Sequence, residues 1–430
     1  MPTWKITADL IKLIFLTLFV AAVLMADQMT FQEGAYKWLQ ILPGFVLSII
    51  NDSGTQWLFV AWLAHIFFHQ FFLDIKKLTL FAAVLMAALA ASLLSLYIVQ
   101  YHDVQPMEVP LFFGAIAFAA MLRRWRFGFH DLKIFDVSTL ILWIIVFILS
   151  ASVVWQPGKE GHYYQGPRWC GFWNNPNTFG MLMSAGIILV IGLGLEKIGT
   201  KESKNKRLLA GVIIIMAGIL LAGLIFSYSR GSWFSCSIGL ASLAWMHGKL
   251  RFQILLPSLV IVAVVVCIFW KNTPNQAPWY IQRLDFSRPS AQNRITAWRA
   301  GFQMIHDHPL GLGWRNAMDS YEKHYAPPKG GPGAIVTNDY LMMGTELGLH
   351  VLACFVGYVG LCLGGKKWQL VDDQHQTISL GKNRAYRAAV VALLVGFWFD
   401  GGLFHLPTAV LFWILLELGC SRPVEPRRIV

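Results

Sequence analysis

Long apolar runs constrain this chain more than any other feature of its sequence. Several of them exceed the roughly 18 uninterrupted apolar residues that typify a membrane-spanning helix. Hydrophobic residues make up 56% of the chain and charged residues only 13%, which excludes an ordinary soluble globular protein. Because lipid offers the backbone no hydrogen-bond partners and the runs lack strand-like alternation, the sequence predicts an all-α polytopic membrane protein.

The apolar runs predict about twelve membrane-spanning helices. Their expected ranges are 8–26, 55–73, 77–99, 106–122, 137–155, 177–196, 207–227, 232–247, 253–270, 339–363, 387–400 and 405–419. The segment 36–50 is short and is broken by Pro43-Gly44, so we expect it to be an external interfacial or re-entrant helix. The length of the first run and the weak cleavage context before Asp27 favour a retained helix over a signal peptide.

The distribution of basic residues predicts which loops between these helices are cytoplasmic. When both termini are cytoplasmic and 36–50 does not cross, most loop lysines and arginines fall inside, including those of 197–207 and 366–387. This bias accounts for the net charge of +12 without a nucleic-acid partner. The predicted organisation has three parts: residues 1–270 with the first nine spans, an external loop at 271–338, and residues 339–430 with the last three spans and a cytoplasmic tail.

The six cysteines form no Cys-x-x-Cys pair, and most lie in apolar segments. They therefore indicate neither a zinc site nor a disulfide framework, and we interpret them as small apolar residues.

Three arginines are expected at the external rim of the membrane. Arg168 precedes a predicted span, Arg230 stands in a very short turn between two spans, and Arg294 lies in the external loop. Guanidinium groups bind phosphate oxygens with fixed geometry, so several at the membrane edge could hold a lipid-linked pyrophosphate. Snorkelling or a salt bridge is the alternative explanation for any one of them. Arg230 is the strongest candidate because its turn is tight and lies where positive charge is otherwise avoided.

Other polar residues near this rim are weaker candidates. The stretch Asn174-Asn175-Pro176-Asn177 fits a helix N-cap, and so does Asn338-Asp339, although exposed amides such as that of Asn177 can also bind sugar hydroxyls. His308 marks a loop turn. Glu346, two turns into a predicted span, could orient Arg294 or Arg230 or act as a base. Asp400 and His405, at the last outer turn, are candidates of the same kind.

These patches together resemble the O-antigen ligase and O-antigen polymerase family, also called the Wzy-C or WaaL-like family. The resemblance covers roughly residues 160–420. The matching elements are Arg-x-x-Gly-x-x-x-Asn-Pro-Asn at 168–177, Ser229-Arg230-Gly231, Arg-x-x-x-Trp at 294–298, His-Pro-Leu-Gly-x-Gly at 308–313 and Asn-x-Tyr-Leu-x-x-x-x-Glu-x-Gly at 338–348.

The resemblance implies a fold like the GT-C-type glycosyltransferases that use polyprenyl-phosphate donors. It implies transfer of a glycan from undecaprenyl pyrophosphate to an acceptor hydroxyl on lipid A-core, a growing glycan or another molecule. The site would face the periplasm from the bacterial inner membrane and need no metal or cofactor. Arg230 and Arg294 match the residues that neutralise the pyrophosphate, and Arg168, Asn177, Arg299, His308 and Asn338 are expected to bind substrate.

One position departs from the family pattern. Thr337 stands where the ligases carry a histidine that is thought to activate the acceptor, and threonine is no general base near neutral pH. Another group could take the proton, with Asp339, Glu346 and His324 nearest in sequence. Alternatively, the chain is a polymerase or divergent branch with another acceptor, or it has lost transferase activity.

Two functions of other classes compete with glycan transfer. A transporter of lipid-linked glycans would be expected to show internal repeats and polar groups near the membrane midplane, whereas this chain shows no evident repeat and places its charge at the rim. An assembly scaffold would leave the rim arginines unexplained. The sequence favours the enzyme.

Overall fold

The structure is a computed structural model that describes residues 137–154, 168–173, 175–199, 206–247, 289–313, 316–327, 338–364 and 376–420. Within these ranges all regular structure is helical, as predicted. The predicted spans at 8–26, 55–73, 77–99, 106–122 and 253–270 and the segment 36–50 lie outside the described residues. The α-helices are α7 (Val137–Val154), α8 (Pro176–Gly199), α9 (Lys206–Phe226), α10 (Arg230–His247), α13 (Pro289–Asp307), α14 (Asn316–Ser320), α15 (Asp339–Met342), α16 (Leu349–Gly364), α17 (Gln376–Phe399) and α18 (Leu406–Cys420).

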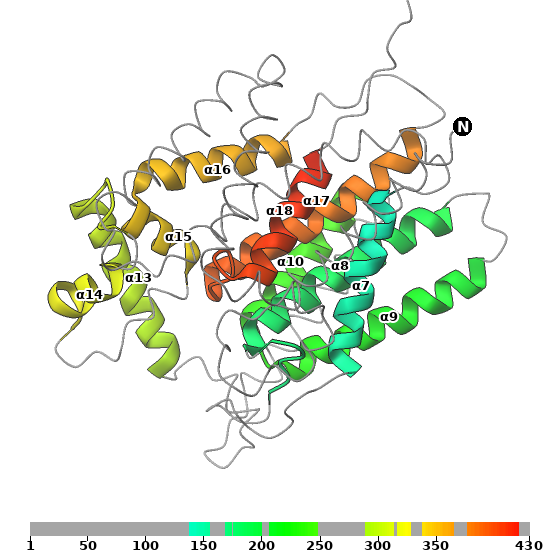
Figure 1. Cartoon of the computed structure of the whole chain (residues 1–430), viewed down its shortest axis with the longest axis horizontal. Helices are drawn as coiled ribbons and strands as arrows, with labels where there is room; N and C mark the ends of the chain where they lie inside the picture. Colours follow the sequence, from blue (N-terminus) through cyan, green and yellow to red (C-terminus); the bar gives the residue numbers. More distant parts are fainter. Residues whose placement is uncertain are drawn as a thin grey trace, which may run out of the picture.

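Helix α8 is the centre of the bundle and packs against α9, α10 and α17 (Figure 1). Small residues let these helices approach closely. A Cβ atom added to Gly192 would lie 2.4 Å from the Cβ of Ala385 on α17, and one added to Gly239 would lie 2.3 Å from Ile188 on α8. Close contact at small residues is how helices gain packing energy inside a membrane, where lipid removes the usual hydrophobic drive.

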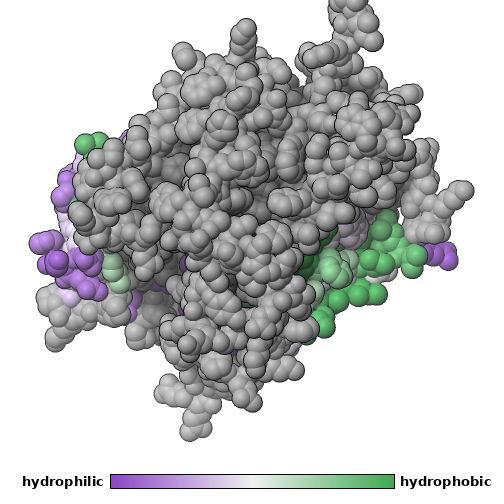
Figure 2. Space-filling view, viewed as in Figure 1, coloured by the Kyte–Doolittle hydropathy of each residue, from purple (hydrophilic) through white to green (hydrophobic). Residues whose placement is uncertain are grey.

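Two described helices, over Pro176–Leu195 and Arg207–Phe226, are long and apolar enough to cross a membrane. They differ in burial, because α8 is enclosed by its neighbours whereas α9 exposes large apolar side chains such as Leu208, Ile214 and Ile215. Figure 2 shows apolar surface gathered along the edge that α9 occupies in Figure 1. Such a surface suits contact with lipid.

The predicted uninterrupted helix over 339–363 is wrong in one respect. The chain forms α15, then a π-helical segment η4 (Met343–Leu347), and then α16 after a break at Gly348. Gly348 has φ of +95°, a conformation outside the helical region that only glycine adopts without strain. Because of this break, α15 runs in a different direction from α16 (Figure 1).

The segment from α13 to residue 325 forms a small second core. Residues of α13 pack against α14 and a π-helical segment η2 (Tyr321–Tyr325), and the buried members are Ala297, Ala300, Met304, Ala317 and Tyr321. In Figure 1 these elements lie together with α15 at one end of the molecule, away from α7 and α9. This arrangement brings α13 against α15 and η4.

Candidate functional site

The site begins at the start of α8, where the sequence supplies a complete helix cap. The Oδ1 atom of Asn175 accepts a hydrogen bond from the backbone N–H of Asn177 at 2.8 Å. Pro176 occupies the first helical position, where its missing N–H costs nothing. The predicted cap is therefore confirmed, and it places the side chain of Asn177 at the helix end.

The Ser229-Arg230-Gly231 turn follows α9 directly and starts α10. Tyr228 has φ of +50° and reverses the chain, while Ser229 caps α10 by accepting the backbone N–H of Ser232 at 3.3 Å. Gly231 is required by close packing, because a Cβ atom there would lie 2.7 Å from Phe399 and 2.8 Å from Oδ2 of Asp400. The turn thus sets Arg230, the first residue of α10, beside the end of α17.

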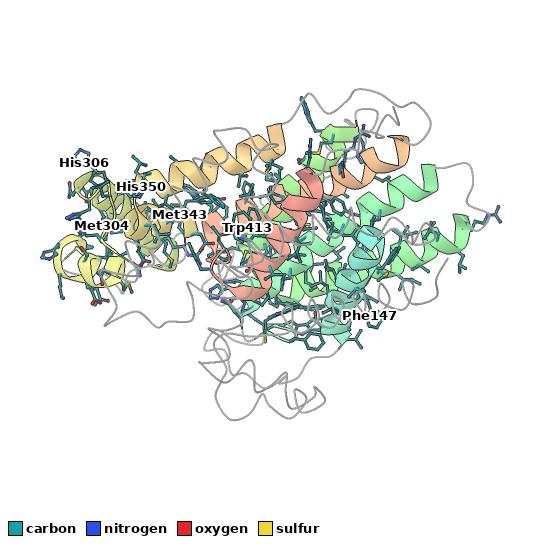
Figure 3. All side chains as sticks on the ribbon, turned by 45° about the horizontal axis from the view of Figure 1, so that its top comes forward. Phe147, Met304, His306, Met343, His350 and Trp413 are labelled. Carbon is teal, nitrogen blue, oxygen red and sulfur yellow. The ribbon has the colours of Figure 1, made fainter. Side chains whose placement is uncertain are left out.

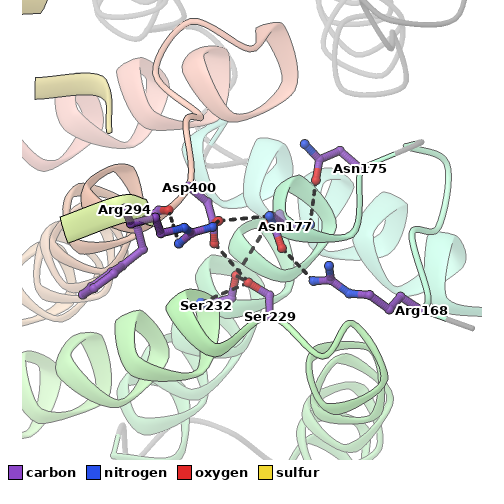
Figure 4. Close-up of polar contacts among 8 residues, drawn as sticks. Arg168, Asn175, Asn177, Ser229, Ser232, Arg294 and Asp400 are labelled. Carbon is purple, nitrogen blue, oxygen red and sulfur yellow. Dashed lines mark hydrogen bonds and ion pairs between the residues drawn. The ribbon is translucent and has the colours of Figure 1, made fainter. Parts of the chain in front are cut away.

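Asp400, just after α17, is the hub to which these helix ends are bonded (Figure 4). Its Oδ1 atom accepts from Nδ2 of Asn177 at 2.9 Å and from Nη2 of Arg294 at 3.1 Å, and its Oδ2 atom accepts from the hydroxyl of Ser229 at 3.3 Å. Nη2 of Arg168 donates to the other end of the Asn177 amide at 2.7 Å. We call Arg168, Asn177, Ser229, Ser232, Arg294 and Asp400 the Asp400 cluster.

Arg168 is also fixed from a second side. Its Nε atom donates to the backbone carbonyl of Ser227, at the end of α9, at 2.7 Å. The aromatic ring of Trp169 packs on Phe226 with ring centroids 4.5 Å apart. These contacts hold the residues before α8 on the α9–α10 turn.

The Arg-x-x-x-Trp element docks α13 on the end of α17. A spacing of four residues puts Arg294 and Trp298 on one face of α13. Arg294 donates to the carbonyl of Phe399 at 2.8 Å as well as to Asp400, and the ring of Trp298 lies 5.7 Å from that of Trp398. Arg294 and Trp298 therefore hold α13 against the end of α17.

The segment that starts at Asn338 is bonded to the loop that follows Asp400. Oδ1 of Asn338 caps α15 by accepting the backbone N–H groups of Tyr340 and Leu341, both at 3.1 Å. Oδ2 of the buried Asp339 accepts the backbone N–H groups of Gly402 and Leu403, both at 2.7 Å. Asp339 therefore shapes the loop that carries Asp400.

The His-Pro-Leu-Gly-x-Gly stretch meets η4 through backbone hydrogen bonds. Leu312 N–H donates to the carbonyl of Thr345 at 2.8 Å, and Gly313 N–H donates to that of Glu346 at 2.9 Å. Gly311 has φ of +94°, and a Cβ atom there would lie 2.5 Å from the carbonyl oxygen of Glu346. Glycine therefore allows the backbone of the 308–313 stretch to approach that of η4 closely.

Several predicted site residues lie apart from the Asp400 cluster. His308 and Arg299 are exposed, Glu346 is buried in η4, and Thr337 lies outside the described residues. Among the described residues, the carboxylate paired with Arg294 is Asp400 rather than Glu346, which the sequence had suggested as a partner.

The sequence ranked Asp400 below its importance in the structure and gave no role to Ser232. An acidic residue at the end of an apolar helix was the available signal for Asp400. Nothing in the sequence linked it to Asn177 or Arg294, because these pairs are separated by 223 and 106 residues.

The arrangement can bind an anion. Two helices, α8 and α10, begin at the cluster and direct the positive partial charge of their N-termini towards it. Two arginines, Arg168 and Arg294, belong to the cluster with the carboxylate of Asp400, and the side chain of Arg294 stays 32% exposed. Within the described residues, no group of three or more His, Cys, Asp or Glu side chains could hold a metal ion.

Comparison with known proteins matches the middle of the chain, which includes part of the Asp400 cluster. Residues 215–356 match a family model described as O-antigen ligase, which supports the predicted family. The matched region contains the turn at Arg230, helix α13 with Arg294, and the segment from Asn338 to Gly348. A search of curated proteins found no match.

Proposed function

We propose that this chain, whose residues 215–356 match the O-antigen ligase family, transfers a glycan from undecaprenyl pyrophosphate to an acceptor hydroxyl at the outer face of the bacterial inner membrane. The observation that carries the proposal is the Asp400 cluster. It joins Arg168, Arg294 and the helix start at Arg230, which come from three distant parts of the chain.

The arginines match the charge that develops in this reaction. The acceptor oxygen forms a bond to the anomeric carbon of the donor sugar, and the bond from that carbon to the pyrophosphate breaks. The lipid pyrophosphate keeps the bonding electron pair and gains negative charge. Preorganised guanidinium groups and helix N-termini stabilise such charge most strongly where water is scarce.

Arg294 is suited to receive the pyrophosphate because only part of its hydrogen-bonding capacity is used by the protein. Its two terminal nitrogens donate to Phe399 and Asp400, and a guanidinium has further N–H groups. The exposed part of the side chain lies at the outer end of the helix bundle. Asp400 balances part of the positive charge and keeps the guanidinium oriented before the donor arrives.

The proton of the acceptor hydroxyl needs a base other than Thr337. We assign this role to Asp339, which lies two residues after Thr337. Its carboxylate accepts two backbone N–H groups. Glu346 is the second carboxylate of this segment, but η4 and the loop at 308–313 enclose its backbone.

Transfer by purified protein tests the proposal. The protein in detergent is given an undecaprenyl-pyrophosphate glycan and candidate acceptors, with chelator present, and product is followed by mass. We expect chelator-resistant transfer that is lost in Arg230→Ala and Arg294→Ala, and the product's size distinguishes a ligase from a polymerase. Donor binding that depends on the arginines without any transfer would contradict the proposal and favour a transport or binding role.

A further inference from the structure

Helix α13 has three distinct faces. One face, with Arg294 and Trp298, docks on the end of α17. A second face, with Ala297, Ala300 and Met304, is buried against α14 and η2. The third face is exposed and carries mixed apolar and polar side chains, which are Ile295, Arg299, Phe302, Gln303 and His306.

The exposed face ends in a groove between α13 and η2. It is lined by Phe302, Gln303, His306, Asp307 and Tyr325 and has a volume of about 570 Å³. Phe302 is 56% exposed, and the imidazole of His306 is 89% exposed. Figure 3 shows His306 at the outer edge of the molecule, pointing away from the helix bundle.

Three polar side chains of the groove are linked by hydrogen bonds. The carboxylate of Asp307 accepts from Nδ1 of His306 at 3.1 Å and from the hydroxyl of Tyr325 at 2.9 Å. The hydrogen bond from His306, with a further contribution from that of Tyr325, lowers the pKa of Asp307. The carboxylate is therefore ionised at neutral pH, and it keeps acceptor capacity because its side chain is 48% exposed.

This set of groups selects one class of ligand. An ionised carboxylate repels phosphate and is poorly suited to an acyl chain, whereas it accepts hydrogen bonds from hydroxyl groups. The Gln303 amide both donates and accepts, as a polyol requires. The rings of Phe302 and Tyr325 offer flat apolar surface to the C–H faces of a sugar ring.

We propose that this groove is a saccharide subsite that holds sugar units of the glycan some distance from its pyrophosphate. The inference rests on the proposed function and adds a second substrate contact to it. Gln303 lies nine residues along α13 from Arg294, or about 14 Å at 1.5 Å per residue. A glycan attached to a pyrophosphate at Arg294 would reach the groove along the exposed face after a few sugar units.

Saturation-transfer NMR tests the subsite without the transfer reaction. The probe is the reducing oligosaccharide released by mild acid from the undecaprenyl-pyrophosphate glycans of the cells that make this protein. It is added to the full chain in lipid nanodiscs. We expect saturation transfer to the sugar in wild type, and binding weakened at least about fivefold in Phe302→Ala and in Asp307→Asn. Ile295→Ala, on the same exposed face but outside the groove, should bind as wild type does.

The possible results separate this inference from the proposed function. Absence of sugar binding to wild type, or equal binding by Phe302→Ala, would overturn the subsite even if the protein transfers glycan. Magnetisation passing from lipid acyl protons to Phe302 in place of the sugar would also overturn it, because the face would then rest on the bilayer. Binding that depends on Phe302 in a protein without transfer activity would support the subsite and refute the transferase.

Discussion

Nη2 of Arg294 lies 3.1 Å from Oδ1 of Asp400, and this ion pair ties α13 to the end of α17. The carboxylate is only 7% exposed, whereas the guanidinium is 32% exposed. Such a pair adds little net stability, because desolvation of the charges offsets their attraction. Its main effect is to fix the orientation of a cation that still faces solvent.

Replacing Arg294 with lysine should therefore reduce glycan transfer even though the positive charge is kept. A lysine ammonium cannot reproduce the fork that donates to Phe399 and Asp400 and also leave donors for a ligand. Loss of one charge-assisted hydrogen bond in the transition state, at roughly 1.5–3 kcal/mol, predicts a decrease in kcat/KM of about 10- to 100-fold. The measurement is steady-state transfer, with Arg299→Lys, on the exposed face of the same helix, as the control.

The helical class was predictable because it follows from a local pattern. Apolar length predicted helices at α8 and α9, and loop charge predicted that Asn177, Arg230 and Asp400 lie on one side of the membrane. Their assembly into one cluster was not predictable. Pairing of Asn177 with Asp400 depends on how α8, α10 and α17 pack, and no local pattern encodes this.

The break at Gly348 was missed for a related reason. The apolar run from Asp339 onward has the composition of a continuous span, and a glycine inside a membrane helix is common. What bends the chain is the backbone of Leu310, which lies 2.6 Å from the position of a Cβ atom at Gly348. This contact comes from a residue 38 positions earlier in the chain, so it is visible only in three dimensions.

Asn177→Asp should destabilise the cluster more than Asn177→Ala does. The asparagine donates to Asp400 and accepts from Arg168, so its two ends have opposite requirements. Aspartate keeps the acceptor but sets a second carboxylate oxygen about 3 Å from the first, and like charges at that distance do not both stay ionised without cost. We expect an additional loss of about 1–3 kcal/mol, seen as a melting temperature a few °C below that of Asn177→Ala in detergent. Equal melting temperatures would show that the amide does not bridge the two groups.

Gly311→Ala should loosen the 308–313 stretch from η4. The φ of +94° is strained for alanine, and its Cβ atom would lie 2.5 Å from the carbonyl oxygen of Glu346. We expect faster hydrogen exchange at Leu312 and Gly313 and a destabilisation of about 1–3 kcal/mol. Gly218→Ala in α9 is the matched control, because no atom lies within 4 Å of its Cβ position. Unchanged exchange in Gly311→Ala would mean that this backbone contact does not form in solution.

Two substitutions of Asp339 separate its structural role from its proposed role as base. Asparagine keeps a carbonyl oxygen that can accept the N–H groups of Gly402 and Leu403, whereas alanine leaves both buried donors without an acceptor. Asp339→Asn should therefore retain the melting temperature within a few °C and lose transfer by about 100-fold or more, since general base catalysis contributes about 10²–10⁴-fold. Asp339→Ala should lose both. Transfer rates and thermal unfolding measured on the same preparations test this. An active, stable Asp339→Asn would leave Asp339 with the positioning of the Asp400 loop alone, and Glu346→Gln would then be the next variant to assay.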